Sequence, residues 1–313
     1  MVQFITILEP GYIRGQPLAA KGRSGGVFFN NKLLEIPLGA REVEENPPPA
    51  SPNMERLEDG VYCGYFVPLF GHFIAEFLPR YEQVRMEGGA TQPILVHPAP
   101  YLVDPKKQLS NSNLIMQFLN ELELPFGQLH FCASDIYVEK LYYTTNVIHL
   151  FESVDKKIIE ISKSLNGRYP VASRDRKIFF SRSRLKEEAR KSINAEEVDA
   201  FFFAQGFEVL HPQEMPVRDQ ILSVCSAKCL AGEEGSALHL SIFNPYLETC
   251  IILDSGRFTR AGAVPDTQKL LNDKLNCKTV YCLPSWSSGG AMQVGGRFVV
   301  DIPALEEILA TAQ

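Results

Sequence analysis

Two adjacent carboxylates stand beside a glycine and small residues in GEEGSALHLSIF, residues 232–243. The segment follows the apolar run CLA, which is typical of the end of a buried strand, and leads into a stretch that we expect to be helical. A helix N-terminus offers unpaired N–H groups and about half a positive charge, which suits a phosphate. We therefore interpret Gly235, Ser236 and Ala237 as a narrow turn for an anionic ligand; an ordinary capped helix is the alternative.

Basic residues follow a second predicted strand. The strand KIFF runs into SRSRLKEEARK, so that Arg182, Arg184 and Lys186 stand just past its end. Cations at that position could neutralise a diphosphate without a metal ion. The alternative is a solvated helix start in which these side chains pair with Glu187 and Glu188.

A histidine and a carboxylate are separated by one helical turn in GHFIAEFLPRY, residues 71–81. On a helix, His72 and Glu76 share one face. A carboxylate can orient an imidazole that acts as a general base, so this pair is a candidate for proton transfer; a structural hydrogen bond is the alternative. Pro79 is expected to kink the helix or to end it.

The cysteines and the acidic residues do not indicate a metal site. The seven cysteines form no CxxC pair and the chain has no N-x-S/T sequon, which together favour a reducing compartment. Cys225 and Cys229 lie one helical turn apart, but no histidine or further cysteine stands at ligand spacing, which favours buried thiols. The candidate ligand loops contain no DxD pair, so we predict no required metal.

Regular elements that could position these residues begin near Val61. The first sixty residues are rich in Gly and Pro, and residues 41–60 are interpreted as a polar connection. The next part predicts strands and helices in VYCGYF, GHFIAEFLPRYEQVRM, PILVHP, NSNLIMQFLNELEL, SDIYVEKLYYTT and FESVDKKIIEISKSLN. The Gly- and Pro-containing segment SLNGRYPVASRDRK, residues 164–177, is the predicted boundary between an N-terminal domain, 1–165, and a C-terminal domain, 166–313.

The second domain alternates strands with helices of about ten residues, which predicts a parallel sheet with crossover helices and hence a Rossmann-like domain. Its strands are KIFF, FEVLHP, KCLAG, TCIILD and KTVYCL. Its helices are NAEEVDAFFFAQG with Asn194 as cap, MPVRDQILSVCSA, SALHLSIF, TQKLLNDKL and a terminal helix with Asp301 as cap and Pro303 in its first turn. Ligands of such sheets bind beyond the carboxyl ends of the strands.

Composition limits the class of protein. The 313-residue chain is 45% hydrophobic and 22% charged, which is ordinary for a soluble globular protein. A formal net charge of −6 argues against a nucleic-acid partner. The N-terminus lacks the pattern of a secretory signal, and no apolar run approaches the ~20 residues that span a bilayer. We expect a cytoplasmic protein.

Three stretches carry a family resemblance: GHFIAEFLPR, then FFSRSRLKEEARKSINAEEVDAFFFAQGFEVLHPQEM, then RDQILSVCSAKCLAGEEGSALHLSIFNP. In this order and spacing, over roughly residues 60 to 255, the chain resembles glycosyltransferase family 61, and more closely its bacterial members of capsular polysaccharide synthesis. The resemblance implies a GT-B architecture, an α/β fold of two Rossmann-like domains facing across a cleft. The C-terminal domain would bind a nucleotide sugar, such as a UDP-sugar, and the N-terminal domain a glycan acceptor.

The resemblance also implies roles for individual residues in an inverting reaction. His72 and Glu76 match the stretch that supplies the base, with His72 slightly preferred. Donor contacts are implied for Arg182, Arg184, Lys186, Asn194, Glu197, Glu234, Gly235, Ser236 and Ala237. The nucleotide sugar is a co-substrate, so no cofactor is expected, and peripheral association with membrane-bound polysaccharide synthesis machinery is the implied wider partnership.

The chain departs from the family at one position of the turn, where members commonly have His and this chain has Glu234. A carboxylate beside a diphosphate repels it unless the carboxylate bonds a hydroxyl or is protonated. Either Glu234 contacts a hydroxyl of the donor, or the donor or its binding mode differs. His239 is a substitute for the missing imidazole or an inward-facing core residue.

Three other functions remain open. A pyruvyl transferase of similar fold would keep the phosphate loops, and a non-catalytic nucleotide-sugar or glycan-binding partner is compatible with the missing family His. A serine hydrolase is the weakest rival, because EEGSA lacks the second Gly of G-x-S-x-G.

Trp286 either stacks on an acceptor sugar or packs against a domain seam.

Overall fold

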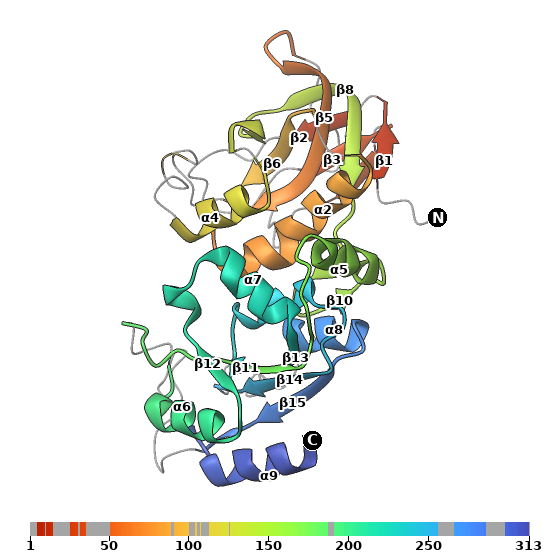
Figure 1. The fold of residues 1–313 in the computed structure, drawn as a ribbon. Coiled ribbons are helices and arrows are strands. Elements are labelled where there is room, and N and C mark those ends of the chain that lie inside the picture. Colours follow the sequence, from red (N-terminus) through yellow and green to blue (C-terminus); the bar gives the residue numbers. More distant parts are fainter. Residues whose placement is uncertain are drawn as a thin grey trace. The chain divides into compact units, whose positions relative to one another are not determined.

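The computed structural model describes residues 5–9, 11–14, 26–30, 32–35, 51–88, 91–99, 104, 107, 113–124, 126–186, 191–255, 266–285 and 298–312. Trp286, Glu187 and Glu188, and residues 41–50 of the expected connection, lie outside this described part. The chain divides into two compact units, Met1–Val147 and Ile148–Gln313, each of which is described by itself (Figure 1).

The boundary between the units lies earlier than the one predicted at 165/166, which falls inside helix α5 (Ile158–Gly167). Helix α5 is tied to the second unit by two buried hydrogen bonds. The Ser162 hydroxyl donates to the Ile242 carbonyl at 2.6 Å, and the Asn166 amide donates to the Phe243 carbonyl at 2.8 Å. The Gly- and Pro-containing segment after α5 is therefore a loop within the second unit.

The first unit is built on a mixed sheet with the strand order β4-β3-β2-β8-β5-β6-β7, and β1 also pairs with β8. Strands β8, β5, β6 and β7 are parallel, and the strands β1 to β4 are antiparallel to their neighbours. The bounds are β1 Ile5–Leu8, β2 Gly11–Arg14, β3 Gly26–Phe29, β4 Lys32–Glu35, β5 Glu55–Phe66, β6 Ile94–Pro98, β7 Leu129–Phe131 and β8 Ile136–Thr144.

The parallel strands β5, β6 and β8 are those that the sequence predicts, whereas β1 to β4 are not predicted. Strand β5 also begins inside the segment interpreted as a polar connection. The sequence did not indicate this start, because residues 55–59 are exposed or partly exposed and the continuous buried run of the strand covers only Gly60 to Phe66. Strands β1 to β4 have four residues each. Such short strands, with Gly in β2 and β3, carry little periodic signal.

The helix after β5 contains a widened turn. It begins as α1 (Phe70–His72), continues as a π-helix, η1 (Phe73–Phe77), and runs on as α2 (Leu78–Met86). Within it, the Leu78 amide donates to the Phe73 carbonyl, five residues back. Pro79, which cannot donate, follows directly, so the π turn accommodates the proline and the helix does not end there. Helix α4 (Asn113–Glu121) and the 3₁₀ turn η2 (Phe126–Gln128) also belong to this unit.

The second unit contains the predicted parallel sheet, with the strand order β12-β11-β13-β14-β15 and every pair parallel. Its strands are β11 Arg176–Phe180, β12 Glu208–Leu210, β13 Ala227–Glu233, β14 Thr249–Leu253 and β15 Lys278–Cys282. The crossover helices are α6 Ala195–Ala204, α7 Val217–Cys225 and α8 Thr267–Lys274, followed by α9 Ile302–Ala312. Smaller elements are β9 Ile148–His149, β10 Ser153–Val154, η4 Pro212–Glu214, β16 Pro284–Ser285 and β17 Val299–Val300.

Helices lie on both faces of this sheet (Figure 1). On one face, Val198 and Phe202 of α6 and Leu305 and Leu309 of α9 form a core with strand residues such as Phe179. Helices α7 and α8 lie on the other face (Figure 1). The expected cap of α9 is confirmed, since the Ala304 amide donates to the Asp301 carboxylate at 3.1 Å.

One predicted helix differs in kind. SALHLSIF forms a six-residue 3₁₀ helix, η5 (Leu238–Phe243), and not an α-helix. Its N-cap residue is Ala237, and no side chain caps it. The predicted α-helix is therefore wrong in kind, and because a six-residue 3₁₀ helix aligns few peptide dipoles, the dipole at its start is weaker than that of the α-helix we expected.

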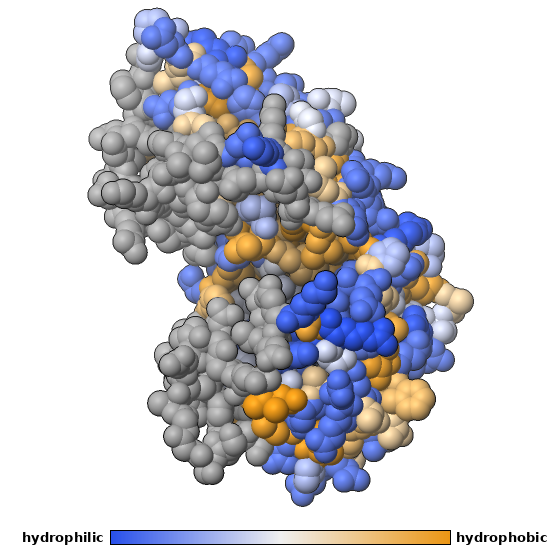
Figure 2. All heavy atoms as spheres, turned by 90° about the vertical axis from the view of Figure 1, so that its left-hand side faces the viewer, coloured by the Kyte–Doolittle hydropathy of each residue, from blue (hydrophilic) through white to orange (hydrophobic). Residues whose placement is uncertain are grey.

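None of the described helices is both long and apolar enough to cross a membrane. Figure 2 shows polar side chains (blue) interspersed with apolar ones (orange) on one face of the described surface. Some large apolar side chains are exposed, among them Phe203 of α6 and Leu283 after β15.

Candidate functional site

The strand order of the second unit creates a topological switch point between β11 and β13. The chain leaves β11 through α6 to form β12 on one side, then returns through α7 to form β13 on the other side. The carboxyl ends of the two central strands are aligned, with Phe180 opposite Gly232. Loops diverge from such a point and leave a crevice that binds ligands in open α/β sheets. The residues that follow Phe180 and Gly232 therefore form the candidate site.

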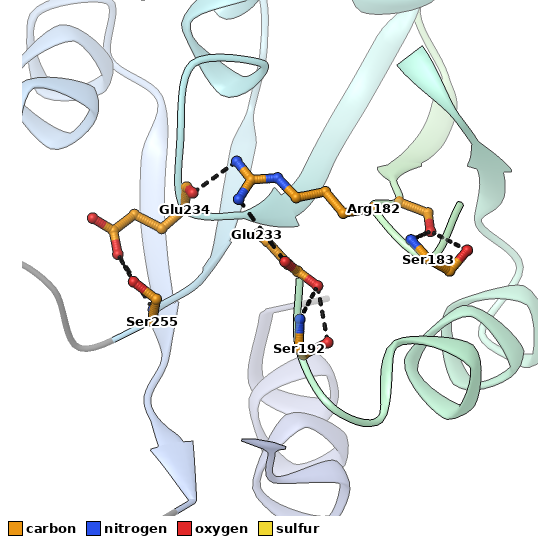
Figure 3. Close-up of polar contacts among 7 residues, drawn as sticks. Arg182, Ser183, Ser192, Glu233, Glu234 and Ser255 are labelled. Atoms are coloured by element: carbon orange, nitrogen blue, oxygen red, sulfur yellow. Dashed lines mark hydrogen bonds and ion pairs between the residues drawn. The ribbon is translucent and has the colours of Figure 1, made fainter. Parts of the chain in front are cut away.

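Arg182 lies across the end of β13 (Figure 3). Its Nη2 donates to the Glu234 carbonyl at 2.8 Å, and its Nη1 lies 3.9 Å from the Glu233 carboxylate. A Cβ on Gly235 would come within 2.1 Å of Nη2, and the φ of Gly235 is +146°. The glycine predicted to let a ligand approach therefore makes room first for the arginine.

Glu233 is buried and points toward Ser192 and Arg182 (Figure 3). Its Oε1 accepts hydrogen bonds from the Ser192 amide at 3.1 Å and from the Ser192 hydroxyl at 2.9 Å. Its Oε2 accepts no hydrogen bond in the described part of the chain. Burial raises the pKa of Glu233, while the Arg182 charge and the Ser192 hydrogen bonds oppose this change.

Glu234 directs its side chain to the opposite side, toward Ser255 after β14 (Figure 3). Its Oε2 accepts from the Ser255 hydroxyl at 2.6 Å and from the Ser255 amide at 3.3 Å. Its Oε1 is a buried atom without a hydrogen bond among the described residues. Burial raises the pKa of Glu234, the Ser255 bond opposes this, and the charges of Asp254 and Asp266 reinforce it. The carboxyl group can therefore bind a hydroxyl either as an acceptor or, when protonated, as a donor.

The other two basic residues expected to contact the donor, Arg184 and Lys186, are exposed. Arg184 pairs with Glu214 of η4 at 2.7 Å, and the two side chains are 60% and 49% exposed. Of the SRSR segment, the structure thus brings Arg182 to the switch point. Arg184 instead forms a solvent-exposed ion pair, as the alternative interpretation expected, but its partner is Glu214 and not Glu187 or Glu188.

Asn194 and Glu197 belong to the start of α6. The Asn194 side chain exchanges two hydrogen bonds with the main chain of Val300, at 2.9 and 3.0 Å, and donates to Glu197 at 3.3 Å. It makes no side-chain cap bond to α6. These contacts give Asn194 a structural task, the attachment of β17 to the α6 start, and Glu197 is exposed.

Sequence reasoning missed three polar residues near Arg182. Ser192 and Ser255 hold the two carboxylates, and the Ser183 hydroxyl donates to Asp199 of α6 at 2.6 Å. The available signal was position: Ser183 and Ser255 follow β11 and β14 within a few residues. Ser192 carried no such signal, because it reaches Glu233 from a loop before α6.

His239 follows the turn at Gly235. Its Nδ1 is 2.8 Å from the Gln268 amide oxygen, and Gln268 in turn donates to Ser241 and Asn272, each at 2.8 Å. This network joins η5 to α8, which supports the interpretation of His239 as an inward-facing structural residue.

The first unit contains the histidine–carboxylate pair. His72 ends α1 and Glu76 lies in the π-helix η1, and His72 Nδ1 bonds the Glu76 carboxylate, as expected for residues on one helix face. Their side chains are 31% and 10% exposed. An ionised carboxylate can only accept, so Nδ1 donates to it, and in the neutral imidazole the lone pair is then on Nε2.

Metal ligands do not converge in the parts of the chain that the structure describes: no group of three or more His, Cys, Asp or Glu side chains there could hold an ion. The cysteines described are not disulfide-bonded, and burial raises the pKa of Cys229 to about 11 and that of Cys225 to about 12. Cys225 is buried and Cys229 is partly buried, and this removal from water is the cause of both shifts.

These features define an α/β protein with an arginine-containing site at the switch point of a parallel sheet and a separate histidine–carboxylate pair. The family model described as Glycosyltransferase 61 matches residues 70–252, more than half of the chain. The chain therefore belongs to glycosyltransferase family 61, which implies glycosyltransferase activity. The match includes His72, Glu76, Arg182 and Glu234 and ends before Ser255. A comparison with curated proteins finds no match.

Proposed function

We propose that the chain is an inverting glycosyltransferase that moves a sugar from a nucleotide-diphosphate sugar, of which a UDP-sugar is the first choice, to a glycan hydroxyl. The product belongs to polysaccharide or glycoconjugate synthesis, of the bacterial capsular type. The proposal includes a GT-B arrangement, in which the two units act as an acceptor side and a donor side that face each other across a cleft. It also includes independence from metal ions and from cofactors.

The observation that carries the donor side is the position of Arg182 at the switch point. Its guanidinium lies over Gly235 and is held by the Glu234 carbonyl at 2.8 Å. A planar cation with several donors suits a diphosphate, and it would stabilise the negative charge that develops on the leaving group. Ser236 and Ala237 keep the following turn narrow, and the Glu234 carboxyl would accept a bond from a donor hydroxyl.

Of the other donor residues expected, Arg184 and Asn194 have partners of their own in Glu214 and Val300, and Lys186 and Glu197 are exposed. The proposal therefore rests on Arg182, Glu234 and the Gly235 turn. Charge neutralisation by Arg182 supports a reaction that requires no metal.

His72 is the proposed base, oriented by Glu76. As the acceptor oxygen attacks the anomeric carbon, its proton passes to His72 Nε2, and the bond from the anomeric carbon to the diphosphate oxygen breaks on the opposite face. The electron pair of that bond leaves with the nucleoside diphosphate. A single displacement of this kind inverts the configuration at the anomeric carbon.

The test is a donor screen with the purified chain. We expect release of nucleoside diphosphate from one UDP-sugar with a glycan acceptor, unchanged by a chelator, and an inverted anomeric configuration in the product by NMR. Turnover of phosphoenolpyruvate in place of nucleotide sugars would establish the pyruvyl-transfer alternative. Binding of a nucleotide sugar without turnover of any acceptor tested would establish the alternative of a non-catalytic partner. The Glu234 in place of the family His is compatible with that alternative.

A further inference from the structure

Glu233 is a deeply buried carboxylate beside the Arg182 site, with a side chain only 2% exposed. A buried carboxylate is costly unless it is paired and hydrogen-bonded. Ser192 satisfies one oxygen with two hydrogen bonds, and the other oxygen faces Arg182 without a hydrogen bond from the described residues. A carboxylate kept in this environment, directly before the ligand turn, calls for a role beyond packing.

We propose that Glu233 is a positioning residue for Arg182: it holds the guanidinium over Gly235 in an orientation that a diphosphate can engage without rearrangement. This inference rests on the proposed donor site. It adds a residue to which neither the resemblance nor the family match gives a role.

Arg182 is restrained by a series of contacts that begins at Ser192 and continues through Glu233. Ser192 restrains Glu233 Oε1 through its amide and hydroxyl, at 3.1 and 2.9 Å, and Oε2 lies 3.9 Å from Nη1 of Arg182. The Glu234 carbonyl accepts from Nη2 at 2.8 Å. Both ends of the guanidinium fork therefore have a fixed neighbour, which lowers the ordering cost of binding an anion.

The charge of Glu233 also opposes diphosphate binding directly, because a carboxylate near a diphosphate repels it. Other groups act on Glu233 as well: the Arg182 charge favours its ionised form, and the Asp199 charge on α6 disfavours it. Removal of the charge alone thus has two opposing effects on anion binding. The effect through Arg182 can be separated from the repulsion, because it requires Arg182 to be present.

The experiment is a double-mutant cycle on the full chain, with UDP as the probe and affinity measured by isothermal titration calorimetry. Glu233→Gln is expected to weaken UDP binding at least about fivefold when Arg182 is present. In the Arg182→Gln background the same substitution should leave affinity unchanged or improve it, since only the repulsion is relieved. Equal or tighter binding by Glu233→Gln alone, or equal weakening in both backgrounds, would overturn the proposal.

A pH series separates positioning from general damage to the fold. The ratio of the UDP affinities of wild type and Glu233→Gln should approach one as the pH falls from about 8 toward the raised pKa of Glu233, because a protonated carboxyl is neutral like glutamine. The titration of UDP itself cancels in the ratio. A ratio that does not vary with pH would show a purely structural effect.

Ser192→Ala provides a second variant that changes no charge. It removes one of the two hydrogen bonds to Oε1 and is expected to weaken UDP binding about two- to threefold without any relief of repulsion. Unchanged affinity in this variant, with an unchanged melting temperature, would contradict the positioning role. If wild type binds neither UDP nor pyrophosphate, the donor site itself is wrong and the inference falls with it, whereas wild-type binding without a Glu233 effect refutes the inference alone.

Discussion

The two candidate regions place their polar groups in different ways. In the first unit, His72 and Glu76 are neighbours on one helix, and the imidazole is 31% exposed. In the second unit, Arg182 and the two glutamates come from the ends of different strands and are held by serines from further segments. The first arrangement needs only local periodicity, whereas the second needs the whole sheet to be in register.

The difference fits the two kinds of chemistry proposed for the two regions. A base must exchange a proton with substrate and needs one accessible nitrogen with a fixed tautomer, which a single carboxylate partner provides. In the proposed anion site, the Arg182 guanidinium contacts the Glu234 carbonyl and lies 3.9 Å from the Glu233 carboxylate, contacts that would orient it toward a diphosphate. Variants in the two regions should therefore separate turnover from donor affinity.

The largest effect is expected for His72→Ala. Loss of a general base should lower kcat by about 10²- to 10⁴-fold, while UDP affinity stays unchanged. Steady-state kinetics and calorimetry on the same preparation measure both quantities. Glu76→Gln should have a smaller effect on kcat, because it removes the orienting charge and leaves the imidazole.

The matched control is His130→Ala in the same unit. His130 forms a pair with Glu55 at 3.3 Å, and the two side chains are 32% and 39% exposed, but this pair lies on β7 and β5 rather than on the helix. Activity should be retained. A comparable loss of kcat in both histidine variants, or none in His72→Ala, would remove the base assignment.

Arg182→Gln should weaken UDP binding about 10- to 100-fold. A hydrogen bond to a charged group contributes about 1.5–3 kcal/mol, and about 1.4 kcal/mol corresponds to a tenfold change. The control is Arg176→Gln, at the amino end of the same strand, where Arg176 and Glu208 form a surface ion pair. Similar affinities for the two variants would mean that the carboxyl end of β11 is not the donor site.

Much of the second unit could be predicted, because each strand and crossover helix carries its own local pattern. The buried run from Ile178 to Phe180 and the alternation that follows it indicate a parallel sheet. The first unit was harder. Strands β1 to β4 are short, and they are stabilised mainly by pairing with one another and with β8, so their formation depends on a neighbour far along the chain.

Two parts of the candidate site were predictable. Position directly after a strand predicted the place of Arg182, and helical spacing predicted the contact of His72 with Glu76. The site was not predictable where the contacts of a residue depend on the direction in which its side chain points. Arg182 and Arg184 are two residues apart and chemically alike, yet one lies over Gly235 and the other pairs with Glu214. Likewise, η5 is too short for periodicity to distinguish an α-helix from a 3₁₀ helix.

Gly235→Ala tests the space that Gly235 leaves for the Arg182 guanidinium, without a change of charge. The added Cβ would come within 2.1 Å of Arg182 Nη2, so the guanidinium must move, and we expect a roughly fivefold loss of UDP affinity with a lower melting temperature. Gly206→Ala is the control, since Gly206 also has a positive φ, +78°, but nothing lies within 4 Å of its added Cβ. It should lower stability without a change in affinity; an equal loss of affinity would show that backbone strain alone is responsible.

The smallest expected effect concerns the pH dependence of stability at Glu234. Burial and the charges of Asp254 and Asp266 raise the pKa of Glu234 above its usual value near 4.5, despite the Ser255 bond. The folded state then holds the proton more tightly than the unfolded chain does. The corresponding stability is fully present below the unfolded pKa and is lost as the pH rises through the folded pKa.

Glu234→Gln removes this linkage, so the melting temperature of the variant relative to wild type should be higher at about pH 8 than at about pH 5. Glu160→Gln provides an exposed control, because Glu160 is 48% exposed and pairs with Lys163 on α5; its difference from wild type should vary little between the two pH values. If the difference for Glu234→Gln is also constant, burial does not penalise the ionised carboxylate. The contrast between the two regions would then lie in geometry alone.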